Sequence, residues 1–398
     1  MIKTIIRSQY LDQLISLIGT PDIKVITGIC RCGKSVLLKE FGKYLKKTFG
    51  EKANIISVDY NSDEAEPLLE YHVLYHYIEK KYQKGKRNFV FIDEVQMCPS
   101  FEKAINWLHN DARYDIYITG SNAFLLSSDL ATLFTGRTFE IEVFPFSFKE
   151  YLQYFGRQDL TPAFNDYLLE GGMAGAYLYK TLAEKHQYVA NVYETLIVRD
   201  INERYKVRNQ DLMNKLSDFL MDNISSQTST RNIANILSTA TSEINDKTIG
   251  NYLKYLTDAF AFYRVRRYDI RGKKYLASQD KYYLADHAFR LAKLGQKNMD
   301  YGRLYENMVA IELKRRGYST YVGTLYDKEI DFVATKRDQV LYIQVADDIS
   351  RPETLERELS SLLSVKDAYP KMIIANTKHD DYTVEGVKIV DLAHWLAQ

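Results

Sequence analysis

The chain has 398 residues, enough for two to four domains, and a formal net charge of +1. Hydrophobic residues make up 46% of the chain and charged residues 26%, proportions typical of a soluble globular protein. The near-neutral charge excludes an argument from global charge for nucleic-acid or membrane binding, so only local basic patches can support one.

Cysteine usage and the N-terminal segment bear on the cellular compartment. Two of the three cysteines, Cys30 and Cys32, lie in one short glycine-bounded loop. The total of three is odd, and two of the three lie inside one loop. Both facts argue against a disulfide framework and favour a reducing compartment. Residues 1–7 are too short in their apolar part for a signal peptide, and no run approaches the ~18 apolar residues of a membrane span. We expect a cytoplasmic protein with no membrane partner.

The first strong motif is a phosphate loop. Residues 28–35 read Gly-Ile-Cys-Arg-Cys-Gly-Lys-Ser, after a strand-like apolar run and before a helical pattern at residues 36–47. Lys34 would reach the β- and γ-phosphates of a nucleotide, and the Ser35 hydroxyl would ligate Mg²⁺. The alternative is a glycine turn before an ordinary helix. The predicted ATP-binding residues are Gly28, Arg31, Gly33, Lys34, Ser35 and Val36.

The second motif places two carboxylates at the end of a buried strand. Residues 88–94 read Asn-Phe-Val-Phe-Ile-Asp-Glu. Asp93 suits Mg²⁺, together with Ser35, because hard cations prefer oxygen ligands. Glu94 suits activation of the attacking water as a general base. The pair would otherwise be solvated surface, but a phosphate loop about 60 residues upstream favours the functional interpretation.

Residues 1–145 alternate strand-like and helical patterns throughout. This succession predicts an α/β fold, a P-loop NTPase core of the AAA+ type with a parallel sheet and ligands at the carboxyl ends of its strands. The strand ending at Asp59 lies between the two motifs along the chain, as in NTPases with an additional strand. The predicted strands are residues 24–28, 54–60, 88–93, 115–121 and 138–144.

Two further residues are candidates for catalysis. Asn122, or Ser121 beside it, follows the fourth strand and would sense the γ-phosphate, although either residue also suits a helix N-cap. Arg137 precedes the fifth strand, where an arginine would reach a nucleotide of a neighbouring subunit in a homo-oligomer. The alternative for Arg137 is a structural ion pair. The predicted catalytic residues are therefore Glu94, Asn122 and Arg137.

Residues 146–205 predict a helical lid, and residues 206–290 a winged-helix domain. In the lid, the glycine-rich stretch 170–175 lacks the Lys-Ser of a phosphate loop and predicts a turn between helices. The winged helix combines helices at 211–224, 230–240 and 248–260 with a hairpin of 262–268 and 274–284. Its basic hairpin would track DNA phosphates, or the module would pack as a lid or interface. The candidate DNA-binding residues are Arg264, Arg266, Arg267, Arg271, Lys273 and Lys274.

Residues 291–398 predict a restriction-endonuclease-like α/β domain. Their order is helix 301–317, strands 319–323, 329–334 and 340–345, helix 354–365 and strand 372–375. Such a fold needs an Asp on one strand and Glu-x-Lys on the next to hold Mg²⁺ and orient water. Asp331 is present with Glu306 on the helix, but Gln344 and Ala346 replace the Glu and Lys. Strand alternation leaves Glu329 and Asp348 as same-face substitutes, so we expect an inactive site.

The chain resembles the AAA+ ATPases of bacteria and archaea that carry a C-terminal restriction-endonuclease-like domain of unknown function. The resemblance spans the whole chain and implies ATPase activity. One departure is Cys30, where the family has Arg, while Arg31 is retained. The motifs that carry it are Val25-Ile-Thr-Gly-Ile-Cys-Arg-Cys-Gly-Lys-Ser, Phe91-Ile-Asp-Glu-Val-Gln, Ile118-Thr-Gly-Ser-Asn, Leu133-Phe-Thr-Gly-Arg, Phe146-Ser-Phe-Lys-Glu-Tyr, Gly171-Gly-Met, Arg199-Asp-Ile, Lys281-Tyr-Tyr, Glu329-Ile-Asp-Phe-Val-Ala, Tyr342-Ile-Gln-Val-Ala and Arg357-Glu.

These patterns support three hypotheses for function. The first is an ATPase that uses Mg·ATP as a switch acting on DNA or on a DNA-bound partner. The second is an ATP-gated signalling or defence protein whose tail binds another protein. The third, disfavoured by Gln344 and Ala346, is an ATP-dependent nuclease. Stimulation of hydrolysis by DNA separates the first from the second, and metal-dependent cleavage would single out the third.

Overall fold

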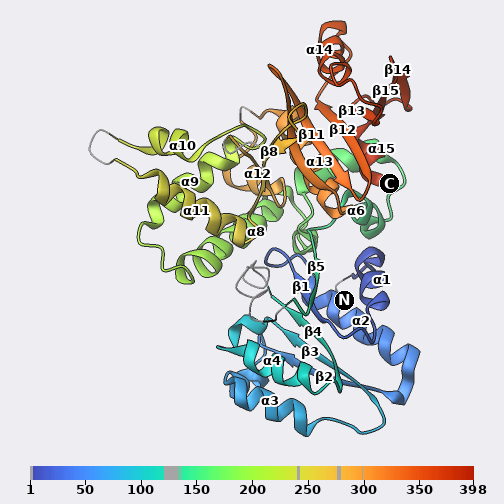
Figure 1. Ribbon diagram of the computed structural model, residues 1–398, viewed down its shortest axis with the longest axis vertical. Helices are drawn as coiled ribbons and strands as arrows, with labels where there is room; N and C mark the ends of the chain where they lie inside the picture. The colour runs from blue at the N-terminus through green and yellow to red at the C-terminus, as the bar shows by residue number, and fades with distance from the viewer. Residues whose placement is uncertain (1–2, 121–133, 135, 240–242, 276–278, 298) are drawn as a thin grey trace. The chain divides into compact units, whose positions relative to one another are not determined.

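The computed structural model describes residues 3–120, 134, 136–239, 243–275, 279–297 and 299–398 (Figure 1). The chain divides into two compact units, whose described parts are residues 3–144 and 145–398. The first boundary lies one residue from the predicted end of the ATPase core. The other predicted boundaries, at 205/206 and 290/291, fall inside the second unit.

A five-stranded parallel sheet forms the centre of the first unit, in the order β2-β3-β4-β1-β5. All five predicted strands are confirmed to within two residues at each end. They are β1 (Ile23–Thr27), β2 (Ala53–Asp59), β3 (Arg87–Asp93), β4 (Tyr114–Thr119) and β5 (Thr138–Glu142). In space the strand between the two nucleotide motifs is β4, whereas β2, which separates them along the chain, lies at the edge. This is the sheet of a P-loop AAA+ domain.

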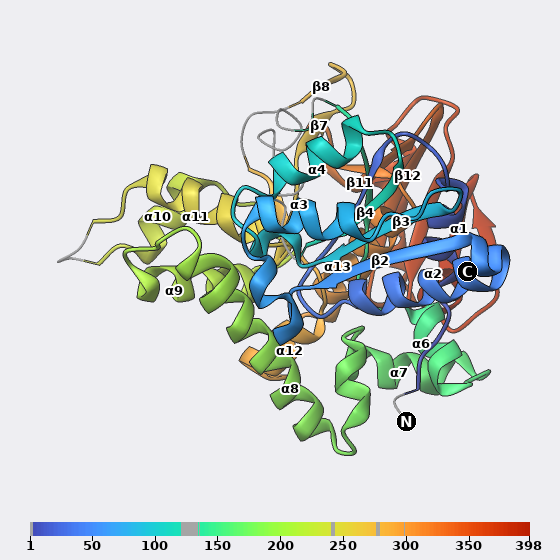
Figure 2. The ribbon, with the colours of Figure 1, turned by 90° about the horizontal axis from the view of Figure 1, so that it is seen from below.

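Helices cover both faces of this sheet (Figures 1 and 2). They are α1 (Ser8–Ser16), α2 (Lys34–Phe49), α3 (Tyr71–Lys80) and α4 (Phe101–Asn110). Successive side chains of a strand point to opposite faces, and β3 is buried on both. Val90 and Ile92 pack with Ile105 of α4, whereas Phe91 stacks on Phe41 of α2 with ring centroids 5.8 Å apart. The apolar run that predicted β3 thus supplies two layers of core.

The second unit begins with helices. They are α6 (Phe148–Phe155), α7 (Leu160–Glu170), α8 (Leu182–Thr195), a π-helix (Leu196–Glu203), α9 (Gln210–Asp222), α10 (Thr230–Leu237), α11 (Asp246–Asp258) and α12 (Ala288–Leu294). Ser147 and Thr181 begin α6 and α8 with complete capping boxes, which satisfy backbone N–H groups that the first helical turn leaves unpaired.

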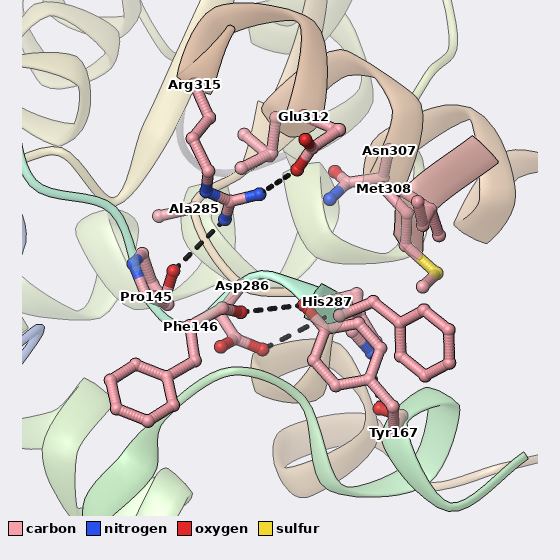
Figure 3. A pocket seen from close by; sticks show the side chains of 13 residues that line it. Pro145, Phe146, Tyr167, Ala285, Asp286, His287, Asn307, Met308, Glu312 and Arg315 are labelled. Atoms are coloured by element: carbon pink, nitrogen blue, oxygen red, sulfur yellow. Dashed lines mark hydrogen bonds and ion pairs between the residues drawn. The ribbon is translucent and has the colours of Figure 1, made fainter. Parts of the chain in front are cut away.

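The predicted turn at Gly171 and Gly172 is a site of close backbone approach. A Cβ atom at Gly172 would lie 2.3 Å from the carbonyl oxygen of Phe146, and one at Gly171 would lie 2.3 Å from Oδ1 of Asp286. The Gly172 N–H donates to Asp286 (2.7 Å), and Phe146 N–H donates to the Gly172 carbonyl (2.8 Å). Phe146 and Asp286 line a small pocket with His287 and Arg315 (Figure 3). Only glycine fits these contacts. Close packing therefore accounts for the glycines at this turn, and a second phosphate loop is not needed to explain them.

An eight-stranded sheet completes the second unit, in the order β14-β15-β13-β12-β11-β10-β7-β8. Its strands are β7 (Arg267–Asp269), β8 (Lys274–Tyr275), β10 (Ser319–Leu325), β11 (Lys328–Lys336), β12 (Gln339–Ala346), β13 (Lys371–Ala375), β14 (Tyr382–Val384) and β15 (Val387–Asp391). The accompanying helices are α13 (Tyr301–Arg315), α14 (Pro352–Leu363) and α15 (Leu392–Ala397). The predicted succession of helix, three strands, helix and strand is confirmed.

The predicted basic hairpin is confirmed where its two arms pair, but the structure adds a partner to it. At the base, β6 (Phe262–Val265) is antiparallel to β9 (Lys281–Leu284), and nearer the tip β7 is antiparallel to β8. In addition, β7 pairs in parallel with Val322–Thr324 of β10, so that β7 and β8 form the edge of the large sheet. The unpaired edge of β10 offered N–H and C=O groups that a local hairpin prediction does not consider.

Candidate nucleotide-binding site and a buried lysine–carboxylate cluster

The phosphate loop leaves β1 and enters α2 through two glycines in conformations that other residues avoid. Gly28 has φ +134° and Gly33 has φ +104°. A Cβ atom at Gly28 would lie 2.1 Å from the carbonyl oxygen of Val143, so the loop passes too close to the chain after β5 for any side chain. The helix begins at Lys34, and its free N–H groups favour an anion there.

Lys34 is buried and held by the loop itself. Its ammonium donates to the carbonyl oxygens of Gly28 (2.9 Å) and Ile29 (3.1 Å). These bonds satisfy a buried charge, and phosphate oxygens would offer it stronger, charge-assisted bonds. Arg31 and Val36, the other predicted ATP-binding residues of this segment, are exposed.

The acidic motif lies beside the loop, as predicted. Burial raises the pKa of the Asp93 carboxyl, and a hydrogen bond from the Ser35 hydroxyl opposes that rise. Glu94 follows in a left-handed conformation (φ 55°), which turns the chain sharply at the strand end, and its side chain accepts from Gln96. Ser35, Asp93 and Glu94 thus meet at the carboxyl edge of the sheet, while Lys34 begins the same helix as Ser35.

Thr119, at the end of β4, is a residue that sequence reasoning missed. Its buried hydroxyl donates to Oδ1 of Asp93 and accepts from the Glu94 N–H at 3.0 Å. It fixes both acidic residues from the neighbouring strand. A threonine at the tip of the predicted fourth strand was the available signal, but the predicted sensor role went to the residues after it. Those residues, Ser121 and Asn122, lie outside the described part of the chain, so the sensor stays a prediction.

Arg7 also approaches the loop, and no sequence pattern singled it out. Its buried guanidinium donates to the carbonyl oxygens of Cys32 (3.0 Å) and Phe144 (2.9 Å). It also lies over the ring of Tyr10, whose hydroxyl accepts from the Phe144 N–H. Arg7 therefore ties the phosphate loop to the last residue of the first unit.

Arg137 lies at the opposite edge of the sheet from the phosphate loop of its own chain. It precedes β5, whose amino end pairs with the amino end of β1, and its exposed guanidinium donates to Asn110 at 3.0 Å. It therefore does not reach the site of its own subunit, and a role in a neighbouring subunit stays a prediction.

Two of the six predicted DNA-binding residues have side-chain hydrogen-bond or ion-pair partners in the second unit. Arg264 pairs with Asp280 at 2.6 Å, and Arg267 donates to Gln279 and Thr324. The other four residues are exposed on and around the β7–β8 turn: Arg266, Arg271, Lys273 and Lys274.

In the second unit, Lys281 of β9 forms a buried cluster with three carboxylates. Its ammonium lies 2.8 Å from Glu306 of α13, 2.6 Å from Glu329 and 3.5 Å from Asp331, the latter two on β11. From the sequence, the carboxylates were considered as metal ligands, whereas Lys281 entered only as part of the Lys281-Tyr-Tyr motif and was given no role. Glu329 lies beside Asp331 on β11, as strand alternation predicted, and Glu306 of α13 joins them around Lys281.

The other predicted positions do not complete this cluster. Gln344 is buried, accepts from the Asp331 backbone N–H (2.7 Å) and donates to Glu358 of α14 (2.8 Å). Asp348, expected on the same face, instead accepts from the backbone and hydroxyl of Ser350. Ala346 is buried and offers no polar group.

Comparison with known proteins agrees with the fold of the first unit. Residues 20–152 match the AAA domain family, and residues 161–300 match a domain family of unknown function. The first unit is thus a nucleotide-binding domain of the AAA+ ATPase class. The restriction-endonuclease-like assignment of residues 291–398 lies almost wholly outside both matches.

Full-length relatives are also known. An uncharacterized protein of Haemophilus influenzae is 36% identical over 396 residues, covering 98% of each chain, and this chain belongs to its family. An uncharacterized protein of Methanocaldococcus jannaschii is 29% identical over 385 residues, covering 92% of this chain and 83% of its own. Among solved structures, the Orc1 protein of Aeropyrum pernix in complex with DNA aligns with TM-score 0.34 at 10% identity, covering 79% of this chain and 94% of its own, a likeness too loose to inform function.

A search of the described helices found none that is long and apolar enough to cross a membrane.

Replacing Lys34 with alanine tests the phosphate loop. Affinity for ATP, measured by titration with a fluorescent analogue, should fall roughly 10- to 100-fold, because a charge-assisted bond to phosphate is lost. Lys43→Ala, an exposed lysine on the same helix, should bind normally. Unchanged affinity in a Lys34→Ala protein with a normal melting curve would refute the assignment.

Proposed function

We propose that this protein binds and hydrolyses Mg·ATP, and uses the cycle as a switch that acts on DNA or on a DNA-bound partner. The observation that carries the ATPase part is the network Ser35–Asp93–Thr119–Glu94 at the carboxyl edge of the AAA+ sheet. Its members come from three elements far apart in sequence. Ser35 and Asp93 offer oxygen ligands for a metal ion, Glu94 offers a general base, and Thr119 positions the two acidic residues.

The side chains present fit a magnesium ion. The Ser35 hydroxyl and the Asp93 carboxylate are adjacent oxygen donors, as a hard cation prefers. When bound, Mg²⁺ would neutralise charge that develops on the transferring phosphoryl group. Lys34 binds the β- and γ-phosphates, the glycine-bounded loop cradles them, and Glu94 accepts the proton of the attacking water.

Replacing Glu94 with glutamine separates binding from turnover. Binding of ATP should persist, while hydrolysis, measured by phosphate release, should fall on the order of 100-fold or more, because only the general base is lost. Glu79→Gln, an exposed glutamate of α3, should keep full activity. Equal rates in Glu94→Gln and wild-type protein would assign the base to another residue.

Arg137 is proposed to complete the site of a neighbouring subunit. Each of Arg137→Ala and Glu94→Gln should be inactive alone, and mixing them should restore part of the activity. A mixed interface can pair the intact Glu94 of one chain with the intact Arg137 of the other. The exposed Arg113→Ala should remain active by itself. A strictly monomeric enzyme, with a specific rate independent of protein concentration, would exclude a role in trans.

The DNA part is supported by the element order of the second unit. Helix α9 is followed by Thr228, which bridges to Asp280, and then by α10, α11 and the β6–β9 pair. We interpret this order as a winged helix, with α11 as the helix that would enter the major groove. The exposed basic turn between β7 and β8 is held by Asp269, which accepts from the N–H groups of Arg271 and Gly272. Its cations would contact phosphates.

A charge-reduced turn tests the DNA hypothesis. Duplex DNA should stimulate ATP hydrolysis by the wild-type chain, and the triple variant Arg271→Ala/Lys273→Ala/Lys274→Ala should lose both stimulation and binding measured by anisotropy. Each lost phosphate contact should make the slope of log K against log salt shallower by about 0.9. The charge-matched triple variant Lys43→Ala/Lys46→Ala/Lys47→Ala is the control. Hydrolysis indifferent to DNA would favour the alternative of a signalling or defence protein that binds another protein.

A further inference from the structure

Three carboxylates converge on the ammonium of Lys281. Oxygens from α13 and β11 meet at one point, and a side chain from β9 fills that point with a positive charge. The distances of 2.6–3.5 Å are those of ammonium hydrogen bonds and ion pairs, longer than most metal–oxygen bonds. Among the described residues, no group of three or more His, Cys, Asp or Glu side chains is arranged to hold a metal ion.

Further donors hold all three carboxylates in place, and the one on Glu329 is the side-chain amide of Gln227. The Tyr283 hydroxyl donates to the same oxygen of Glu306 that Lys281 contacts, at 2.6 Å. The Val345 backbone N–H donates to Oδ2 of Asp331 at 2.9 Å. A metal ion entering the cluster would have to displace Lys281 and compete with these protein donors.

We infer that Lys281 is the resident cation of this cluster, a fixed ammonium that takes the place of a divalent metal and fastens the β6–β9 pair to the C-terminal sheet. The domain then needs no metal to hold its carboxylates together, and has no open coordination position for metal-assisted hydrolysis. The inference does not rest on the proposed nucleotide chemistry, because every group involved lies in the second unit.

Charge and burial are consistent with this assignment. Lys281 is 4% exposed, and a buried ammonium is tolerated only when it is paired. Burial acts to lower the pKa of Lys281, but Glu306, Asp331 and Glu329 outweigh it and raise the pKa, so the ammonium stays charged. Burial also raises the pKa of Glu306, to about 8, and the neighbouring Lys281 ammonium opposes that rise.

Removing the ammonium should expose a metal site. In nucleotide-free protein, Lys281→Met should bind Mn²⁺ at least about tenfold more tightly than the wild type, as measured by electron paramagnetic resonance. Adding Asp331→Asn should abolish the gain, because the carboxylate ligands would be incomplete. Lys388→Met, at a half-exposed lysine of the same sheet, should gain nothing.

A second measurement covers loss of folding. Lys281→Met should lower the melting temperature by about 10 °C, because it leaves buried like charges unpaired. Adding Glu306→Gln should restore at least half of that loss by removing one of them. Failure of this rescue would overturn the inference.

Experiments on the wild-type chain provide an independent test of the inference. Saturable Mn²⁺ binding to it that disappears in Asp331→Asn, or metal-dependent cleavage of DNA that disappears in the same variant, would show that Lys281 leaves the site open. A folded Lys281→Met protein that binds no Mn²⁺ would equally refute a latent cation site.

Discussion

Parallel pairing of β4 with both β1 and β3 is the constraint on which the nucleotide site depends. It aligns three strand ends at one edge, so that the phosphate loop, Thr119 and Asp93 lie side by side. Thr119 then joins Asp93 and the Glu94 backbone through one buried hydroxyl. A sheet with β1 next to β3 would separate the end of β4, and with it Thr119, from the acidic pair.

The parts of this site that the sequence could predict are those encoded in short contiguous stretches. The phosphate loop and the strand ending at Asp93 each carry their own pattern, and a fully buried strand is legible as an apolar run. Arg7 and Thr119 carry no such pattern. Their roles arise from contacts with Phe144 and Asp93, 137 and 26 residues away, which form only when the sheet is assembled.

The second unit shows the same limit more sharply. The strands of residues 319–375 were predicted well, because each carries an apolar or alternating pattern, but the prediction of a local hairpin missed a second pairing of the short strand β7. Its partner, β10, begins about fifty residues later in the chain. Likewise, a lysine in a strand ordinarily indicates a solvent-facing position, and Lys281 is buried only because Glu306, Glu329 and Asp331 surround it.

The two features that were not predicted, the β7–β10 pairing and the Lys281 cluster, connect the same two segments of the chain. The β7–β10 pairing is a backbone connection between residues 206–290 and 291–398, and the Lys281 cluster is a side-chain connection between the same segments. Separating them would break a strand pairing and leave buried charges unpaired, which is costly. If nucleotide turnover moves the proposed DNA-binding hairpin, the C-terminal sheet must therefore move with it. This mechanical connection to the hairpin does not require metal chemistry in the C-terminal sheet.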